Sequence, residues 1–238
     1  MPYLEHAAEP ALSRWVECVW SIETADPLLA YPVRPDGCID ILYSPTDGPE
    51  IVGAMTAERR FDLAPQARTA GIRFRPGMAA QFLRIPAEEL TDRILPLEDP
   101  ALADRLANAQ SADECRRILA SSLRAPADPP NGVQRAIEAV ASSHGDIDLE
   151  WVARQAGMSE RQFRRRCLEE SGLPPKQLCR VLRFRRAFTL GERGLPWGLV
   201  AAEAGYYDQA HLIRDFREFT GGDTPMSVFS NTRDGHSG

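Results

Sequence analysis

The chain has 238 residues, of which 43% are hydrophobic and 26% charged, and its formal net charge is −6 at pH 7. This length suits two modest domains, and no stretch approaches the roughly 18 apolar residues that a membrane-spanning helix needs. The acidic start, MPYLEHAAEPALSRW, lacks the apolar run of a signal peptide, so we expect a cytoplasmic protein. Five widely spaced cysteines fit neither a disulfide framework nor a metal-binding CxxC motif.

The first half of the chain carries strand signals followed by helix signals. Stretches rich in Val, Ile, Trp and Tyr, bounded by proline and glycine, predict strands over 14–22, 38–43, 50–54 and 70–74. After Pro76 the pattern predicts helices over 77–83, 86–90, 99–109 and 111–123. We therefore predict an α+β chain whose N-terminal part is a small β-sheet or partial barrel with packed helices. Whether the sheet closes is left open.

The segment SLRAPADPPNG, residues 122–132, marks a domain boundary because its prolines and small residues prevent a helix from continuing. The predicted organisation is a β-rich domain over 1–125, a linker over 126–132 and a helical domain over 133–230. The β-rich domain is expected to sense a ligand or to form a dimer. In the helical domain we predict helices over 133–142, 149–156, 160–170, 175–191, 196–204 and 209–219, the fourth of which links the pairs on either side.

The helical domain contains one pattern twice, as LEWVARQAGMSERQFRRRC and as LVAAEAGYYDQAHLIRDF, about 48 residues apart. Each copy has a Val-Ala pair, an Ala-Gly pair three residues on, a polar turn, and two apolar residues four apart. Gly157 is expected to end the first helix of its copy. Ser159 and Gln162 form a capping box at the start of the next helix, and Asp208 is the corresponding N-cap residue in the second copy. This pattern is typical of a helix-turn-helix, and its duplication favours a protein that reads two successive DNA grooves over a plain helical bundle.

The charge distribution supports DNA binding despite the acidic total. Residues 1–130 hold 13 Lys and Arg against 20 Asp and Glu, whereas residues 131–238 hold 15 against 14. Within 159–193 there are ten basic and four acidic residues. Phosphate contacts need a basic surface on one side of the domain, not a basic protein.

Arginines are expected on the exposed side of the first recognition helix, because Phe163 and Cys167 point inward. An arginine donates two parallel hydrogen bonds to guanine, so Arg161 and Arg165 are predicted to contact bases, while Arg166 is expected to contact phosphate or to pack. The alternative is that these side chains contact only phosphates or solvent. The predicted DNA-binding residues are Arg161, Arg164, Arg165, Arg166, Gln209, His211 and Arg214, with Arg183 and Arg186 facing outward, like Arg180, on the linking helix.

The segment from about 133 to 229 resembles the DNA-binding domain of AraC/XylS-type bacterial transcription regulators. The resemblance is carried by VARQAGMSERQFRRRC, GLPPKQLCRVLRFRRA and VAAEAGYYDQAHLIRDFREFTGGDTP, with Pro225 at the close. It implies base contacts at Arg161, Arg164 and Arg165 and at Gln209, His211 and Arg214. The family usually has an arginine soon after the closing proline, where this chain has MSVFS. The N-terminal half resembles a compact effector domain of such regulators, without naming a ligand.

The acidic half offers a ligand site with two interpretations. In one interpretation Asp36 and Asp40 flank Cys38 and form a polar cleft with Arg34, Arg73 and Arg75; in the other, PDG is a turn and these charges make surface ion pairs. In one interpretation an apolar pocket is lined by Trp15, Trp20, Tyr31 and Tyr43; in the other, these residues belong to the ordinary core of the sheet. The predicted ligand-binding residues among them are Trp20, Tyr31, Asp36, Cys38, Tyr43 and Arg73.

Two classes of function follow from these features. The first is a sequence-specific transcription regulator modulated by a small molecule at the N-terminal domain. Its expected partners are double-stranded DNA, RNA polymerase if it activates transcription, and a second copy of the chain bound through the N-terminal domain. The alternative is a ligand-binding protein or enzyme whose C-terminal helices are only an interaction module. No GxSxG, HExxH or phosphate-binding glycine loop is present, and the four histidines are scattered, so we predict no enzyme, no cofactor and no metal.

Overall fold

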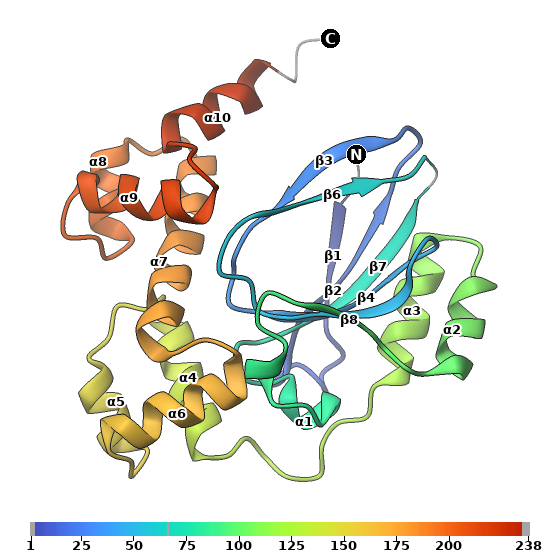
Figure 1. Cartoon of the computed structure of the whole chain (residues 1–238), viewed down its shortest axis with the longest axis horizontal. Helices are drawn as coiled ribbons and strands as arrows, with labels where there is room; N and C mark the ends of the chain where they lie inside the picture. Colours follow the sequence, from blue (N-terminus) through green and yellow to red (C-terminus); the bar gives the residue numbers. More distant parts are fainter. Residues whose placement is uncertain (1–2, 66, 235–238) are drawn as a thin grey trace.

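The computed structural model of the chain describes residues 3–65 and 67–234 (Figure 1). Its N-terminal half contains an antiparallel sheet with the strand order β1-β2-β7-β4-β5-β8 and a separate hairpin of β3 and β6. The sheet strands are β1 (Tyr3–Ala7), β2 (Val16–Glu23), β4 (Ile39–Ser44), β5 (Gly48–Val52), β7 (Arg68–Phe74) and β8 (Ile94–Pro96). The hairpin strands are β3 (Leu28–Val33) and β6 (Arg59–Leu63), and two short helices are α1 (Ala80–Leu83) and η1 (Ala87–Glu89). The predicted α+β class is confirmed.

The sheet packs one face against helices and turns the other toward the β3–β6 hairpin. Along β4 the buried side chains of Ile39, Ile41 and Tyr43 alternate with the half-buried Asp40 and Leu42, because successive side chains of a strand point to opposite faces. Helices α2 (Pro100–Ala107) and α3 (Ala112–Ser122) lie to the right of the sheet in Figure 1, with α3 against β7 and β2. The β3–β6 hairpin lies over the other face of the six-stranded sheet, and a cavity lies between the two.

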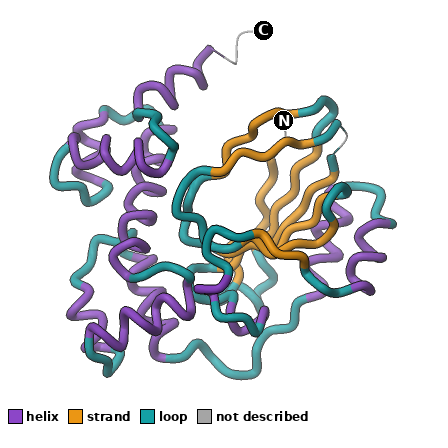
Figure 2. Tube along the Cα trace, in the orientation of Figure 1, coloured by secondary structure: helices purple, strands orange, loops and turns teal. Residues whose placement is uncertain are grey.

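The described part of the C-terminal half consists of helices joined by loops and contains no strand (Figure 2). All six helices predicted from the sequence are present, with ends within two residues of the prediction. A further helix, α10, follows the closing proline. The seven helices are α4 (Gly132–Ser142), α5 (Leu149–Gln155), α6 (Glu160–Ser171), α7 (Pro175–Glu192), α8 (Trp197–Glu203), α9 (Gln209–Phe219) and α10 (Pro225–Asp234). In the described part of the chain, none of the helices is long and apolar enough to cross a membrane.

The two halves share one continuous hydrophobic core. The buried cluster that begins with Ile41 and Ile72 in the sheet continues through Ile137 on α4 to Leu178 on α7. Glycine allows the closest approach: at Gly77, whose φ is +77°, a Cβ atom would come within 2.8 Å of Ile137. The segment between α3 and α4 therefore connects two bodies that are packed against each other.

Candidate nucleic-acid interface and ligand pocket

Two helix-turn-helix units lie at opposite ends of α7, the first formed by α5 and α6 and the second by α8 and α9 (Figure 1). In the first, the Ser159 hydroxyl accepts a hydrogen bond from the Gln162 backbone N–H at 3.3 Å, and the Gln162 side chain accepts one from the Ser159 N–H at 2.9 Å. In the second, the Asp208 carboxylate accepts from the His211 N–H at 2.7 Å. The turn glycines, Gly157 and Gly205, both have positive φ. The capping chemistry expected from the repeat is present in both units.

Each recognition helix is anchored by the predicted pair of apolar residues. Phe163 and Cys167 on α6 are buried, as are Leu212 and Phe216 on α9. These anchors decide which side of each helix remains outside, because residues three and four apart share a face. The arginines of α6 are therefore left on its outer side.

Arg180 on α7 fastens the second unit. Its guanidinium donates to Asp215 at 2.8 Å and to Glu218 at 2.5 Å, both on α9, and lies 5.2 Å from the ring centroid of Phe219. The sequence pattern placed Arg180 on an outward face, and this expectation was wrong. A helical period cannot show that α9 returns across α7 with a buried carboxylate opposite this position.

The predicted DNA-binding residues of α6 form an arginine-rich surface. Arg161, Arg164 and Arg165 are exposed and Arg166 is half-buried. Arg165 donates to Glu169 at 2.8 Å, and Arg166 lies 3.6 Å from the same carboxylate. Such exposed ion pairs contribute little stability, so these arginines can leave Glu169 and bind DNA phosphates or bases instead.

The second unit and α7 present fewer cations. Gln209 and Arg214 on α9 are exposed, whereas His211 packs edge-on against Tyr206 with ring centroids 5.1 Å apart. Arg183 on α7 lies 5.9 Å from the Tyr206 ring, and Arg186 lies 3.9 Å from Glu203. His211 and Arg183 thus pack partly against Tyr206, while the side chains of Gln209 and Arg214 remain exposed to solvent.

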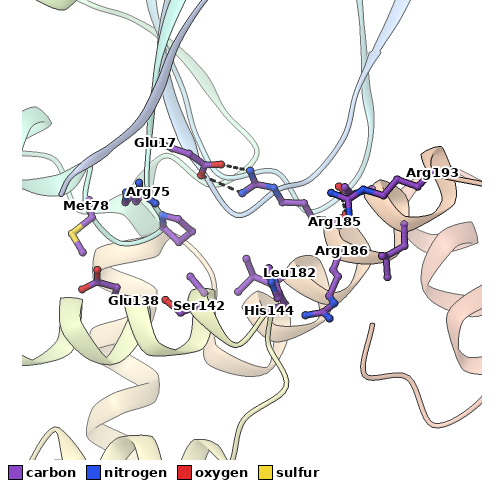
Figure 3. A pocket seen from close by; sticks show the side chains of 14 residues that line it. Glu17, Arg75, Met78, Glu138, Ser142, His144, Leu182, Arg185, Arg186 and Arg193 are labelled. Carbon is purple, nitrogen blue, oxygen red and sulfur yellow. Dashed lines mark hydrogen bonds and ion pairs between the residues drawn. The ribbon is translucent and has the colours of Figure 1, made fainter. Parts of the chain in front are cut away.

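A cleft of about 560 Å³ lies between part of the N-terminal half and helices α4 and α7 (Figure 3). Glu17 on β2 and Arg185 on α7 form an ion pair across it, and Arg186, predicted to face DNA, also lines this cleft. Burial opposes ionisation of Glu17, but the hydrogen bond and charge of Arg185 hold its pKa below the usual range. Sequence reasoning missed this pair because nothing in the pattern connects residues 168 positions apart.

Two loops of the N-terminal half, residues 53–58 and 87–93, touch the C-terminal ends of both recognition helices, and we call them the bridging loops. The Thr91 hydroxyl donates to the carbonyl of Gly172 at the end of α6 at 2.6 Å. The Glu58 N–H donates to the carbonyl of Phe219 at the end of α9 at 2.7 Å. These bonds satisfy helix-end carbonyls that lack partners within the helix.

Asp92 ties the bridging loops to each other. Its carboxylate accepts from the Thr56 N–H at 2.8 Å and from the Thr56 hydroxyl at 2.6 Å. Asp92 itself has φ of +55°, a strained conformation for a residue other than glycine. The two recognition helices are therefore connected through one strained, hydrogen-bonded element of the N-terminal half.

A second cavity, of about 940 Å³, lies between the sheet and the β3–β6 hairpin. Five of the six residues predicted to bind a ligand line it: Trp20, Tyr31, Asp36, Cys38 and Arg73. Tyr43 does not, and this prediction is corrected. It is buried among Ile39 and Ile41 on the helix-covered face of β4, and the alternation of the strand places Leu42 in the cavity instead.

Trp20 forms part of the cavity wall because Gly71 on the neighbouring strand leaves room for its ring. A Cβ atom at Gly71 would come within 2.4 Å of the indole. The indole N–H donates to Asp40 at 3.0 Å, which fixes the ring orientation. Asp40 and Arg34, expected from the sequence to form a polar cleft with Asp36, also line this cavity, whereas Arg75 lines the cleft beside α4 and α7. Trp15, expected in the apolar pocket, does not line this cavity.

Carboxylates surround Arg73 in this cavity. The guanidinium lies 3.2 Å from Asp36, 3.4 Å from Asp40 and 3.5 Å from Glu5. Burial raises the pKa of Asp40 from 3.8 to about 6, although the Arg73 charge opposes the shift. The single positive charge of Arg73 does not offset the negative charges of the three carboxylates around it.

Asp40→Asn is expected to be better tolerated at pH 7.5 than at pH 4, because the parent protein must ionise a buried carboxyl group that the amide does not have. The folded protein binds the Asp40 proton more tightly than the unfolded chain, so ionisation lowers its stability as pH rises from about 4 to about 6. The free energy of unfolding of the variant, relative to the parent protein, should therefore be higher at pH 7.5 than at pH 4. Urea unfolding at both pH values measures this, and an equal effect at both would contradict the assignment.

Among the described residues, no group of three or more His, Cys, Asp or Glu side chains could hold a metal ion. Burial raises the pKa of the Cys38 thiol well above its usual value, and the Asp36 charge adds to the shift. The thiol is therefore protonated at neutral pH.

Comparison with known protein families finds two matches. Residues 152–229 match the model of a helix-turn-helix domain, which spans both units described above. Residues 4–96 match the model of a domain of unknown function, DUF6597, which spans the sheet and the hairpin. No curated protein matches the chain.

Several solved structures are similar to this chain. The DNA-binding domain of AdpA, solved with a target DNA, is 24% identical, with 46% of this chain and 100% of that chain covered and a TM-score of 0.42. A DNA-binding transcriptional dual regulator from Escherichia coli K-12 is also 24% identical, with 46% and 98% covered and a TM-score of 0.39. ToxT from Vibrio cholerae, bound to an unsaturated fatty acid, is 12% identical, with 88% and 92% covered and a TM-score of 0.44. Similarity at this level carries no detail of a ligand or a DNA site.

Proposed function

We propose that the chain is an AraC-type, DNA-binding transcription regulator and that it reads two successive major grooves, with α6 in one groove and α9 in the next. The main support for this proposal is the duplicated helix-turn-helix. On α6 the buried apolar residues face inward, which leaves Arg161, Arg164 and Arg165 exposed. Recognition helices in consecutive grooves must be about 34 Å apart, and the rigid connection through α7 supports such a fixed spacing.

The two recognition helices are proposed to contribute unequally. On α6 the exposed arginines can bind guanine in pairs of hydrogen bonds, whereas α9 offers Gln209 and Arg214 with His211 partly packed. We propose base contacts for Arg161 and Arg165, and phosphate or packing roles for Arg166, Arg183 and Arg186. The choice of sequence is then weighted toward the groove that α6 occupies.

The experiment is to select binding sites from random DNA with the full chain and then to compare Arg165→Ala with the parent protein. Loss of a bidentate contact should cost about 1–3 kcal/mol at one or two base pairs and leave the other positions unchanged. Arg117→Ala, which removes an exposed arginine paired with Asp113 on α3, is the matched control.

Two outcomes would count against this function. An equal loss at every base pair would mean that Arg165 touches only the DNA backbone. No preference for any sequence at low salt would contradict the regulator itself, and binding should otherwise weaken steeply as salt is added.

The N-terminal cavity is proposed to bind the small molecule that modulates DNA binding. Gly53 and Met55 line the cavity and belong to the bridging loop 53–58, whose Glu58 bonds the end of α9. A ligand that displaces this loop therefore changes the contacts of α9, and through Asp92 those of α6. Both helices could respond to one binding event.

Other partners remain part of the proposal. RNA polymerase is the expected partner if the protein activates transcription, and a second copy of the chain is expected to bind through the N-terminal domain. DNA binding also agrees with the cytoplasmic location predicted from the sequence. The alternative of an enzyme with a helical interaction module has no supporting constellation of side chains in the described part of the chain.

A further inference from the structure

We propose that the cavity between the sheet and the β3–β6 hairpin is selective for hydrophobic organic cations, such as an amine or an onium ion attached to an apolar body. This inference rests on the proposed function, since it names the class of effector for the same cavity. Its volume of about 940 Å³ lies within the range of about 300–1,000 Å³ typical of sites for small ligands.

The charges of the cavity wall are strongly unbalanced. Three arginines line the cavity against a larger set of carboxylates. The acidic lining residues are Glu5, Asp36, Asp40, Asp47, Glu50, Asp62 and Glu192. A positively charged ligand would relieve the mutual repulsion of these groups, whereas a negatively charged one would increase it.

All three lining arginines already have partners, and two of them, Arg34 and Arg73, lie beside carboxylates. Arg73 contacts the carboxylates of Asp36, Asp40 and Glu5. Arg34 lies 3.2 Å from Glu58, and its guanidinium lies 4.3 Å from the centre of the Phe188 ring. Arg68 donates to the carbonyl of Ala109 at 2.5 Å. At Arg34 and Arg73 an anionic ligand would compete with carboxylates of the protein itself.

At least one carboxylate, by contrast, remains available to a cation. Glu50 on β5 lies opposite Leu42 on β4, and both line the cavity. No other described residue forms a hydrogen bond or an ion pair with the Glu50 carboxylate, and burial together with the charge of Asp47 raises its pKa. A bound cation would therefore neutralise a group that the fold leaves without a counter-charge.

Aromatic rings supply the second half of the recognition. Trp20 and Tyr3 lie with ring centroids 6.0 Å apart, and Tyr31 and Phe61 line the hairpin side of the cavity. The faces of such rings attract cations, and their area accommodates an apolar body. Aromatic rings and a carboxylate without a counter-charge thus line the same cavity, which selects both the charge and the hydrophobicity of a ligand.

The test uses probe ions of equal shape and opposite charge on the full chain. Isothermal titration calorimetry compares tetraphenylphosphonium with tetraphenylborate, and 4-phenylbutylammonium with 4-phenylbutyrate. In at least one pair the cation should bind at least about tenfold more tightly than the anion, a difference of about 1.4 kcal/mol. Equal or tighter binding of the anions, or no binding of either cation, would overturn the proposal.

Variants locate the site. Glu50→Gln and Tyr31→Ala should each weaken the preferred cation by about three- to tenfold, while Asp104→Asn, an exposed carboxylate on α2, should leave its binding unchanged. Cation binding that neither Glu50→Gln nor Tyr31→Ala reduces would mean that the probe sits elsewhere, and would also overturn the proposal. Thermal unfolding of each variant shows that its fold is intact.

A DNA-binding measurement on the same protein samples distinguishes failure of the proposed ligand class from failure of the proposed regulatory function. Sequence-specific DNA binding without a preference for cations would overturn only the ligand class. Absence of sequence-specific DNA binding, with the cation preference intact, would instead contradict the regulatory function and leave the cavity's selectivity standing.

Discussion

Asp215→Ala is expected to lower the free energy of unfolding by about 3–5 kcal/mol and to abolish sequence-specific DNA binding. The Asp215 side chain is only 3% exposed, and it is the buried partner of Arg180. Removing the buried member of an ion pair is strongly destabilising, and here it leaves Arg180 with only the exposed carboxylate of Glu218. Because Arg180 fastens α9 to α7, the same change releases the helix that carries Gln209 and Arg214.

Glu218→Gln provides the matched control. Glu218 contacts the same arginine, but its side chain is 55% exposed, so we expect a change below about 1 kcal/mol. Chemical unfolding of the full-length variants gives the comparison, and fluorescence anisotropy with a selected DNA site gives the binding. If the two substitutions cost the same, Arg180 is a surface ion-pair residue and does not hold α9 in place.

Phe163→Ala is expected to destabilise the protein by about 3–5 kcal/mol, the usual cost of removing a buried phenylalanine side chain. Phe163 is 2% exposed and anchors α6 to the first unit. A loss of this size is a large share of the total stability of an ordinary domain, so α6 would no longer present its arginines in a fixed orientation.

The neighbouring substitution Arg164→Ala should have the opposite profile. Arg164 is exposed on the same turn of α6, so its removal should leave the unfolding midpoint nearly unchanged while reducing affinity for DNA. Thermal unfolding and DNA titration of both variants test this pair. A large stability loss in Arg164→Ala, or none in Phe163→Ala, would contradict the assignment of inner and outer sides to this helix.

The helix-turn-helix units could be predicted because their signals are local. Turn glycines, capping residues and apolar pairs four residues apart act within one or two turns of helix, so Gly157, Ser159 and Phe163 identified the first unit without any tertiary information. Strands β2 and β7 were found from local composition too, since both hold β-branched and aromatic residues.

The remaining features depend on contacts between distant segments. The hairpin of β3 and β6 was not predicted because its strands have no buried face: Leu29, Ala30, Arg60 and Asp62 are exposed. The partners of Arg180 and Arg185 lie 35 and 168 residues away, respectively. No periodicity reports such pairs.

Tyr43 illustrates a third kind of error, one that local reasoning could have avoided. Asp40 and Leu42 share one face of β4, and Tyr43 necessarily shares the other with Ile41. Grouping aromatic residues by type placed Tyr43 in the cavity, whereas grouping them by strand parity places it in the core.

The continuous core between the halves limits how this regulator can change during evolution. Gly77 is packed against Ile137, and Gly37 has φ of +82° and lies so close to α7 that a Cβ atom would come within 3.0 Å of Leu178. A helical half transplanted onto another sensor would expose Ile137 and Leu178, unless the new sensor supplied glycines and a matching surface. The N-terminal and helical halves of this chain must therefore diverge together, residue against residue, and not as interchangeable modules.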